Sequence, residues 1–80
     1  MNGSEAKSFA LAMAGEGERV RIVALRAGKG LDKRLTDLGL NVGTEVSVIQ
    51  RQGGGLLVAR DNARVAVGAG MAMKILVVPA

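Results

Sequence analysis

Short apolar segments separated by glycine-rich corners are the feature that most constrains the fold of this chain. Residues 19–25 show the pattern best, because Val20 and Ile22 fall on one face of an extended chain while Arg19 and Arg21 fall on the other. A period of two with β-branched residues on one side predicts a half-buried strand. With 12 glycines in 80 residues, many of them beside such segments, we expect short strands joined by tight connections.

The same pattern predicts five short strands, at residues 19–25, 45–50, 56–60, 63–67 and 73–78. Asp61 and Asn62 separate two of them and predict a tight hairpin, because both residue types tolerate a positive φ. Residues 51–55 contain three consecutive glycines and predict a flexible connection, and residues 68–70 predict another turn. So many short strands in so short a chain predict a mainly β fold, either a small sandwich or a partly closed barrel.

One segment changes from strand spacing to helix spacing. Leu31, Leu35 and Leu38 lie at positions i, i+4 and i+7, which predicts one apolar stripe of a two-turn helix. Gly39 follows at the position where helices often end in the left-handed conformation, and Leu40 can then pack back on the helix as in a Schellman cap. We expect these leucines to pack the helix against the apolar faces of the strands.

Length and composition bound the remaining possibilities. The chain has 80 residues, which suits one small domain, and we expect a loose polar tail at 1–8 followed by a single domain at 9–80. The chain has no Cys and no His, so the hydroxyl side chains have no histidine to activate them and the usual zinc and iron ligands are missing. We therefore expect no catalytic residues, no bound cofactor and no metal ligands in this chain.

Targeting signals are also missing from the sequence. The apolar stretches are much shorter than the roughly 20 residues that a spanning helix needs. We therefore expect a cytoplasmic protein that does not insert into the membrane. The methionines at 13, 71 and 73 could offer thioether ligands, but methionine is far more often a filler of gaps in a core.

The charge balance leaves a nucleic-acid-binding function open as an alternative. Lys and Arg number 11 against 7 Asp and Glu, for a formal net charge of +4. A basic balance favours an acidic partner. However, the chain has only one aromatic residue, Phe9, and small barrels that bind nucleic acid commonly stack bases on several. A small-barrel nucleic-acid-binding module is therefore the second hypothesis, and we do not expect nucleic acid to be the partner.

The order of the motifs provides a further hypothesis. They are Gly30-Leu31-x-x-Arg34-Leu35-x-x-Leu38-Gly39-Leu40, then Gly43-Thr44-Glu45-Val46, then Val65-Ala66-Val67-Gly68, and a final Ala72-x-x-Ile75-Leu76-Val77. This order and spacing resemble the FeoA family, the small ferrous iron transport protein A, over about residues 9–78.

The resemblance implies a small SH3-like barrel, five-stranded in this chain, with one short α-helix. In such a barrel we expect this helix to plug one end with its leucines. It also implies a non-enzymatic accessory of ferrous iron transport that binds the cytosolic G domain of the FeoB transporter. By family association, weak binding of a divalent transition metal such as Fe²⁺ is a further expectation. Since partner contacts of a rigid barrel lie on exposed helix faces and loops, we expect them at Lys33, Arg34 and Asp37 and at the glycine loop, Gly53, Gly54 and Gly55.

Overall fold

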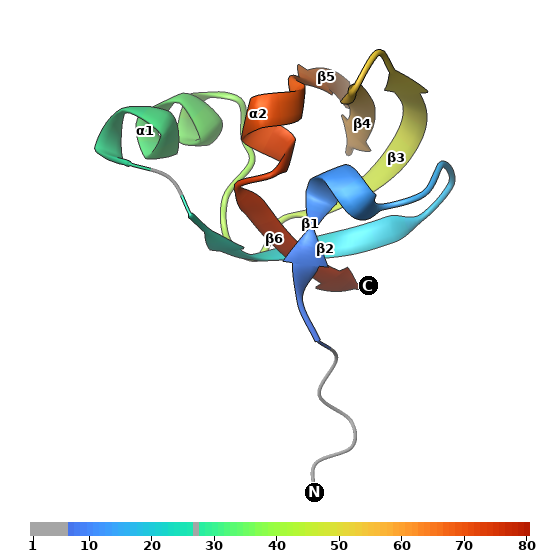
Figure 1. Ribbon diagram of the computed structural model, residues 1–80, viewed down its shortest axis with the longest axis horizontal. Helices are drawn as coiled ribbons and strands as arrows, with labels where there is room; N and C mark the ends of the chain where they lie inside the picture. The colour runs from blue at the N-terminus through green and yellow to red at the C-terminus, as the bar shows by residue number, and fades with distance from the viewer. Residues whose placement is uncertain (1–6, 27) are drawn as a thin grey trace, which may run out of the picture.

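The computed structural model describes residues 7–26 and 28–80, and these form one curved, antiparallel sheet with short helices beside it (Figure 1). Most of the predicted tail lies outside the described residues. In chain order the elements are β1 (Phe9–Ala10), the 3-10 helix η1 (Leu11–Met13), β2 (Arg19–Leu25), α1 (Lys29–Asp37), β3 (Glu45–Gln52), β4 (Gly55–Arg60), β5 (Ala63–Val67), α2 (Ala69–Ala72) and β6 (Ile75–Pro79).

The strands pair in the order β1-β6-β2-β3-β4-β5, and every pairing is antiparallel. The alternation along β2 predicted the buried face correctly, since Val20 and Ile22 are fully buried while Arg19 and Arg21 are exposed. Val20 lies opposite Val46, and Val48 lies opposite Val58, so one aliphatic layer continues across three strands. Among the described residues no buried side chain is polar or charged.

The prediction of a mainly β, SH3-like fold is confirmed, but the details differ. The sheet has six strands rather than five, the described chain holds two short α-helices rather than one, and the sheet is not closed. β1 has only two residues, too few to show an alternation. The turn predicted at 68–70 is instead the start of α2, a four-residue helix that buries Ala72. Neither element is long enough to carry a periodic signal.

The glycine-rich segment at 51–55 is not the flexible connection that we expected. β3 continues to Gln52 and β4 begins at Gly55, opposite Gln52, so only Gly53 and Gly54 form the turn. These two glycines have φ values of 53° and 93°. Positive φ at both central positions is the geometry that joins two twisted strands through a two-residue loop. The predicted hairpin at Asp61 and Asn62 is confirmed, with Asp61 at a φ of 54°.

The predicted end of α1 is also confirmed. Gly39 has a φ of 78°, its N–H donates to the carbonyl of Thr36 at 2.9 Å, and the N–H of Leu40 donates to the carbonyl of Leu35 at 2.8 Å. These two bonds define a Schellman cap. Leu35 and Leu40 are fully buried, so the cap fixes where the helix meets the core.

The helix does not plug the barrel as expected. Figure 1 shows α1 projecting beside the sheet, while η1 and α2 lie across its concave side. α2 contacts β4 and η1, and Leu11, Ala14 and Ala72 are fully buried in the core. Leu35 is buried and Leu38 is half-buried, so α1 adds to one edge of the core and does not cover the end of the barrel. The side chain of Leu31 lies outside the described structure.

Arg51 joins β3 to the segment that precedes β2. Its Nη1 donates to the carbonyls of Ala12 and Ala14 at 2.8 and 2.7 Å, and its backbone N–H donates to Oε2 of Glu16 at 2.9 Å. Ala12 lies within η1 and Ala14 is the residue directly after it, so neither carbonyl has a strand partner. One guanidinium therefore satisfies the end of η1 and fixes it against the sheet.

Replacing Arg51 with methionine keeps much of the aliphatic stem and removes the hydrogen bonds to both carbonyls. We expect Arg51→Met to lower the free energy of unfolding by about 1–2 kcal/mol, because partly buried carbonyls lose a charged donor. Urea denaturation would measure this effect. Arg64→Met is the matched control, because it removes the same charge from an exposed strand position. Equal losses in the two variants would contradict the role given to Arg51.

Alanine at Gly39 should destabilise the protein for two separable reasons. The φ of 78° disfavours any residue with a Cβ, and that Cβ would lie 2.6 Å from Nε of Arg60. We expect Gly39→Ala to cost about 1–2 kcal/mol in thermal or chemical denaturation.

Two comparisons test that explanation. Gly30→Ala, in the first turn of α1 with nothing within 4 Å, should not destabilise the protein and should stabilise it by at most about 0.5–1 kcal/mol. In an Arg60→Ala background, Gly39→Ala should lose the steric part of its cost and keep the backbone part. A Gly39→Ala variant as stable as the original chain would show that the left-handed cap is not required.

Candidate functional site: a polar groove beside helix α1

A polar groove of about 710 Å³ lies where the loop between α1 and β3 meets the ends of β3 and β4. We call it the polar groove. Its lining residues are Arg19, Gly39, Asn41, Gly43, Thr44, Glu45, Ser47, Ala59, Arg60 and Asp61. They include two arginines and two acids, together with three neutral side chains that can accept or donate hydrogen bonds, which suits contact with a polar surface.

Small side chains on neighbouring strands lie along the groove. Arg19 of β2 is opposite Ser47 of β3, and Ser47 is opposite Ala59 of β4. These residues alternate with buried ones and therefore lie on the outer face of the sheet. Because Ser47 and Ala59 are short, the outer face is hollowed between the long side chains of its neighbours.

Arg60 lines the groove from the end of β4. It follows the buried Leu56 and Val58 at strand spacing, so its stem starts on the inner face of the sheet. Its guanidinium lies close to Gly39, and its Nη1 is 3.6 Å from Oδ2 of Asp61. Nε of Arg60 is buried and has no hydrogen-bond partner in the described structure. The Arg60 guanidinium therefore occupies the space that the missing Cβ of Gly39 leaves open.

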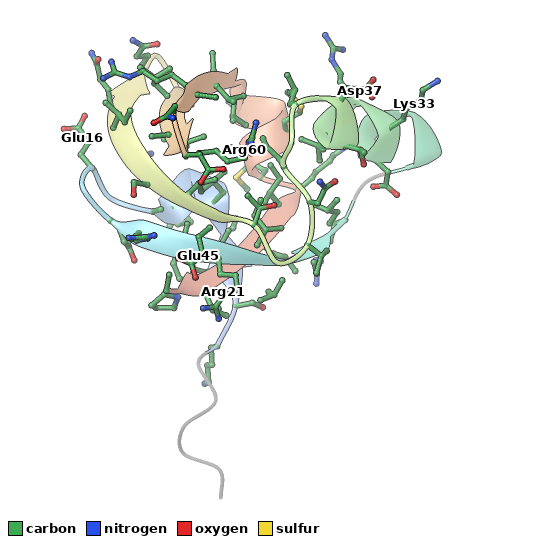
Figure 2. All side chains as sticks on the ribbon, turned by 180° about the vertical axis from the view of Figure 1, so that it is seen from behind. Glu16, Arg21, Lys33, Asp37, Glu45 and Arg60 are labelled. Carbon is green, nitrogen blue, oxygen red and sulfur yellow. The ribbon has the colours of Figure 1, made fainter. Side chains whose placement is uncertain are left out.

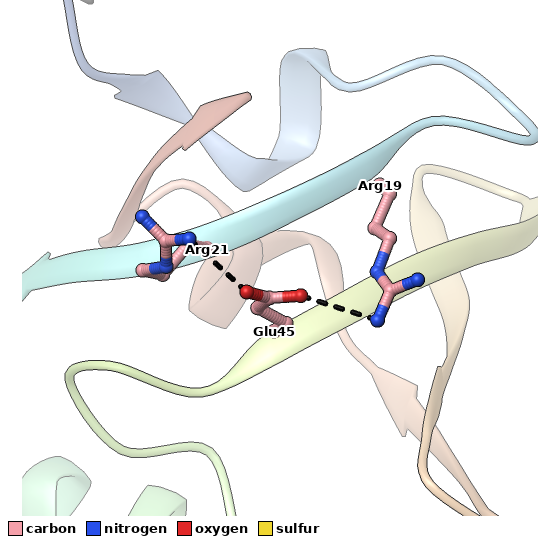
Figure 3. Close-up of polar contacts among 3 residues, drawn as sticks. All are labelled: Arg19, Arg21 and Glu45. Atoms are coloured by element: carbon pink, nitrogen blue, oxygen red, sulfur yellow. Dashed lines mark hydrogen bonds and ion pairs between the residues drawn. The ribbon is translucent and has the colours of Figure 1, made fainter. Parts of the chain in front are cut away.

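Glu45 lies between two arginines on the outer face of the sheet (Figure 3). Its Oε1 is 3.2 Å from Nη2 of Arg19, and its Oε2 is 3.1 Å from Nη2 of Arg21. The hydrogen bond from Arg21 and the positive charges of Arg19 and Arg21 lower the pKa of Glu45 below its ordinary value of 4.5. Two of the basic residues beside the groove are thus already engaged with an acid of the same chain.

The residues that we predicted as partner contacts lie in two separate places. Lys33, Arg34 and Asp37 are exposed on α1, which leads through Gly39 into the groove, and Figure 2 shows Lys33 and Asp37 on this projecting helix. The glycine turn, residues 53–55, lies on the far side of α2 from α1 (Figure 1). The structure therefore does not bring the two predicted regions together on one surface.

Sequence reasoning missed the polar groove, although one signal could have indicated it. The alternation of Leu56, Val58 and Arg60 places an arginine in register with core residues at the end of a strand. A charged side chain at such a position has to leave the core at its margin. The contribution of the loop between α1 and β3 could not be deduced, because it depends on how far α1 projects from the sheet.

The described residues outside the polar groove do not form a metal site or a base-stacking surface. Within residues 7–26 and 28–80, no three side chains of the His, Cys, Asp and Glu types gather where they could hold a metal ion. Met13 and Met73 are largely exposed, and Met71 packs against the core. Phe9 is half-buried against the core, so it does not offer an open stacking surface for a nucleic-acid base. No helix in the described part of the chain is long and apolar enough to cross a membrane.

Comparison with known proteins decides the family. The FeoA domain model matches residues 9–79. The chain belongs to the FeoA domain family. A relative from Methanocaldococcus jannaschii named "Putative Fe(2+) transport protein A" is 39% identical over 69 residues, which are 86% of this chain and 84% of the relative. The resemblance found in the order of the sequence motifs is therefore confirmed.

Solved structures show the same fold. A crystal structure of an iron uptake regulatory protein, FeoA, matches with a TM-score of 0.85 at 23% identity. The match covers 92% of this chain and 100% of that protein. A manganese-dependent transcriptional repressor in complex with manganese matches with a TM-score of 0.87 at 21% identity, covering 95% of this chain but only 38% of the repressor. The FeoA fold thus also occurs as part of larger proteins.

The lowered pKa of Glu45 predicts an acid-dependent loss of stability in this FeoA domain. A carboxylate whose folded pKa is below its unfolded pKa stabilises the fold above the unfolded value, and the stabilisation is lost as pH falls through the folded value. The difference in unfolding free energy between the original chain and Glu45→Gln should therefore be present near neutral pH and shrink below about pH 4.5. Chemical denaturation across this range would measure it.

High salt provides the control for this measurement. The ion pairs of Glu45 are largely exposed, so salt should screen them and reduce the difference at neutral pH. A difference that grew as the solution became more acidic would contradict the assignment.

Proposed function

We propose that this FeoA-family chain is a cytoplasmic, non-enzymatic accessory of ferrous iron transport that docks on the cytosolic G domain of a FeoB-type transporter. The observation that carries the proposal is the family match over residues 9–79, together with the ferrous iron transport name of its 39%-identical relative. In this proposal Fe²⁺ is the cargo of the transport system, and any binding of the ion to this chain itself is weak.

The chemistry of the surface supports docking over catalysis. The charged residues of the polar groove lie at an open surface. One of its two acids, Glu45, forms ion pairs with two arginines. A general acid or base needs a carboxylate or similar group free to exchange a proton with a bound substrate. Paired charges and short polar side chains on a rigid sheet instead suit a complementary protein surface.

The docking face in this proposal consists of the exposed side of α1 and the polar groove. α1 leads directly into the groove through its Schellman cap, so the two are continuous. Lys33, Arg34 and Asp37 present charge on the helix, and Gly39 and Arg60 line the groove into which the helix leads. The glycine turn lies on another side and is left out of this face.

Binding of the purified cognate G domain, followed by isothermal titration calorimetry, tests the proposal. We expect the original chain to bind, and Lys33→Glu combined with Arg34→Glu to bind about tenfold or more weakly, because two charges in the docking face are reversed. Gln52→Glu places an acid beside the glycine turn without straining the positive-φ glycines, and it should leave the affinity unchanged.

Two results would contradict the proposal. No heat at protein concentrations on the order of tens of micromolar would remove the G domain as the partner. Binding that depends on Gln52 and not on Lys33 and Arg34 would keep the partner but move the docking face to the glycine turn.

A further inference from the structure

The edge formed by β5 (Ala63–Val67) ends the sheet without a partner on its outer side. Within the described residues β5 pairs with β4 alone, and no hydrogen bond from another segment reaches the backbone of Arg64 or Ala66. Figure 1 shows β5 at the top of the molecule, at the end of the sheet. An open strand edge is a row of donors and acceptors that can pair with another chain.

The register shows which backbone groups are free. Arg60 and Ala63 are partners across a two-residue turn, and such a pair must exchange both hydrogen bonds. Counting along the strand in steps of two, Ala63, Val65 and Val67 bond to β4. The N–H and C=O groups of Arg64 and Ala66 therefore point away from the sheet.

Nothing in β5 obstructs pairing on this side. Its register with β4 has no bulge over all five residue pairs, and the strand contains no proline. Ala66 is small, and the side chains of Arg64 and Ala66 are both exposed on the outer face. Bulges, prolines and inward-facing charges are among the means of blocking an edge, and β5 has none of them. Its one charged side chain, Arg64, is exposed and would repel a basic strand but not an acidic one.

We propose that the β5 edge is a strand-addition site for an extended segment of a partner protein in which acidic and apolar side chains alternate. An acidic side chain would lie opposite Arg64, and the following apolar side chain would lie beside Val65, which is 9% exposed at the margin of the core. The formal net charge of +4 and the nearby Arg60 add attraction for an acidic segment.

The same charges argue against a second copy of this chain as the occupant. Pairing of two β5 edges would bring two domains of charge +4 together and would place an Arg64 from each on the shared outer face. The inference rests on the proposed function in that the chain acts by docking, but it does not require the G domain to supply the segment.

Amide NMR of the full chain tests the inference with two designed peptides. The probe is the pentapeptide acetyl-Glu-Val-Glu-Val-Glu-amide, and its matched control carries lysine in place of each glutamate. We expect the acidic peptide to slow hydrogen exchange at the N–H of Arg64 and of Ala66 while that of Val65 keeps its original protection. At low salt the acidic peptide should bind about tenfold more tightly than the basic one.

Substitutions at the edge sharpen the test. Ala66→Pro removes one outward N–H without breaking a bond to β4 and should weaken peptide binding about tenfold. Ala66→Val keeps that N–H and should retain binding. Arg64→Glu should reverse the preference in favour of the lysine peptide, which keeps the test informative if the proline variant does not fold.

The outcomes separate this inference from the proposed function. Equal binding of both peptides, changes confined to other strands, or self-association of the chain through Arg64 and Ala66 would overturn the strand-addition site. If the chain binds the G domain yet neither peptide alters β5, the site falls and the proposed function stands. If the acidic peptide binds at β5 but the chain does not bind the G domain, the strand-addition site stands and the proposed function falls.

Discussion

The structure depends on burying small aliphatic side chains without any covalent or metal cross-link. With no Cys and no His in the chain, packing has to supply the stability that disulfides or zinc supply in many small domains. Valine, leucine, isoleucine and alanine fill the described core, and each fully buried aliphatic side chain larger than alanine contributes about 1.5–3 kcal/mol. Every polar side chain of the described residues is therefore at least partly exposed, where it is available to a partner.

This constraint also explains why the connections matter so much. A core built from short strands is formed only if each turn has the correct geometry. Gly39 supplies the positive φ value that the end of α1 needs, and Gly53 and Gly54 supply those of the turn between β3 and β4. Gly39 has a second role, since its missing Cβ leaves space for the guanidinium of Arg60. One residue thus ends α1, orients Leu40 into the core and shapes the polar groove.

Much of the fold could be predicted because the relevant signals are local. Alternation at Val20 and Ile22 and the Schellman signal at Gly39 are properties of a few neighbouring residues, and the structure confirms both. The predictions that failed concern features without a local sequence signal. α2 is too short to show a period, and the position of α1 beside the sheet depends on contacts with distant segments. The groove was missed for that reason, since it combines residues between Arg19 and Asp61 that only the tertiary fold brings together.

The most direct test of the account is a map of the bound surface. Titrating the isotope-labelled chain with its cognate G domain should shift the amides of α1, of the loop after Gly39 and of Arg60, and leave buried positions such as Val48 and Val77 unchanged. That result would show docking on a preformed, rigid surface. Shifts spread through the buried strands, or confined to the turn at Gly53 and Gly54, would contradict it.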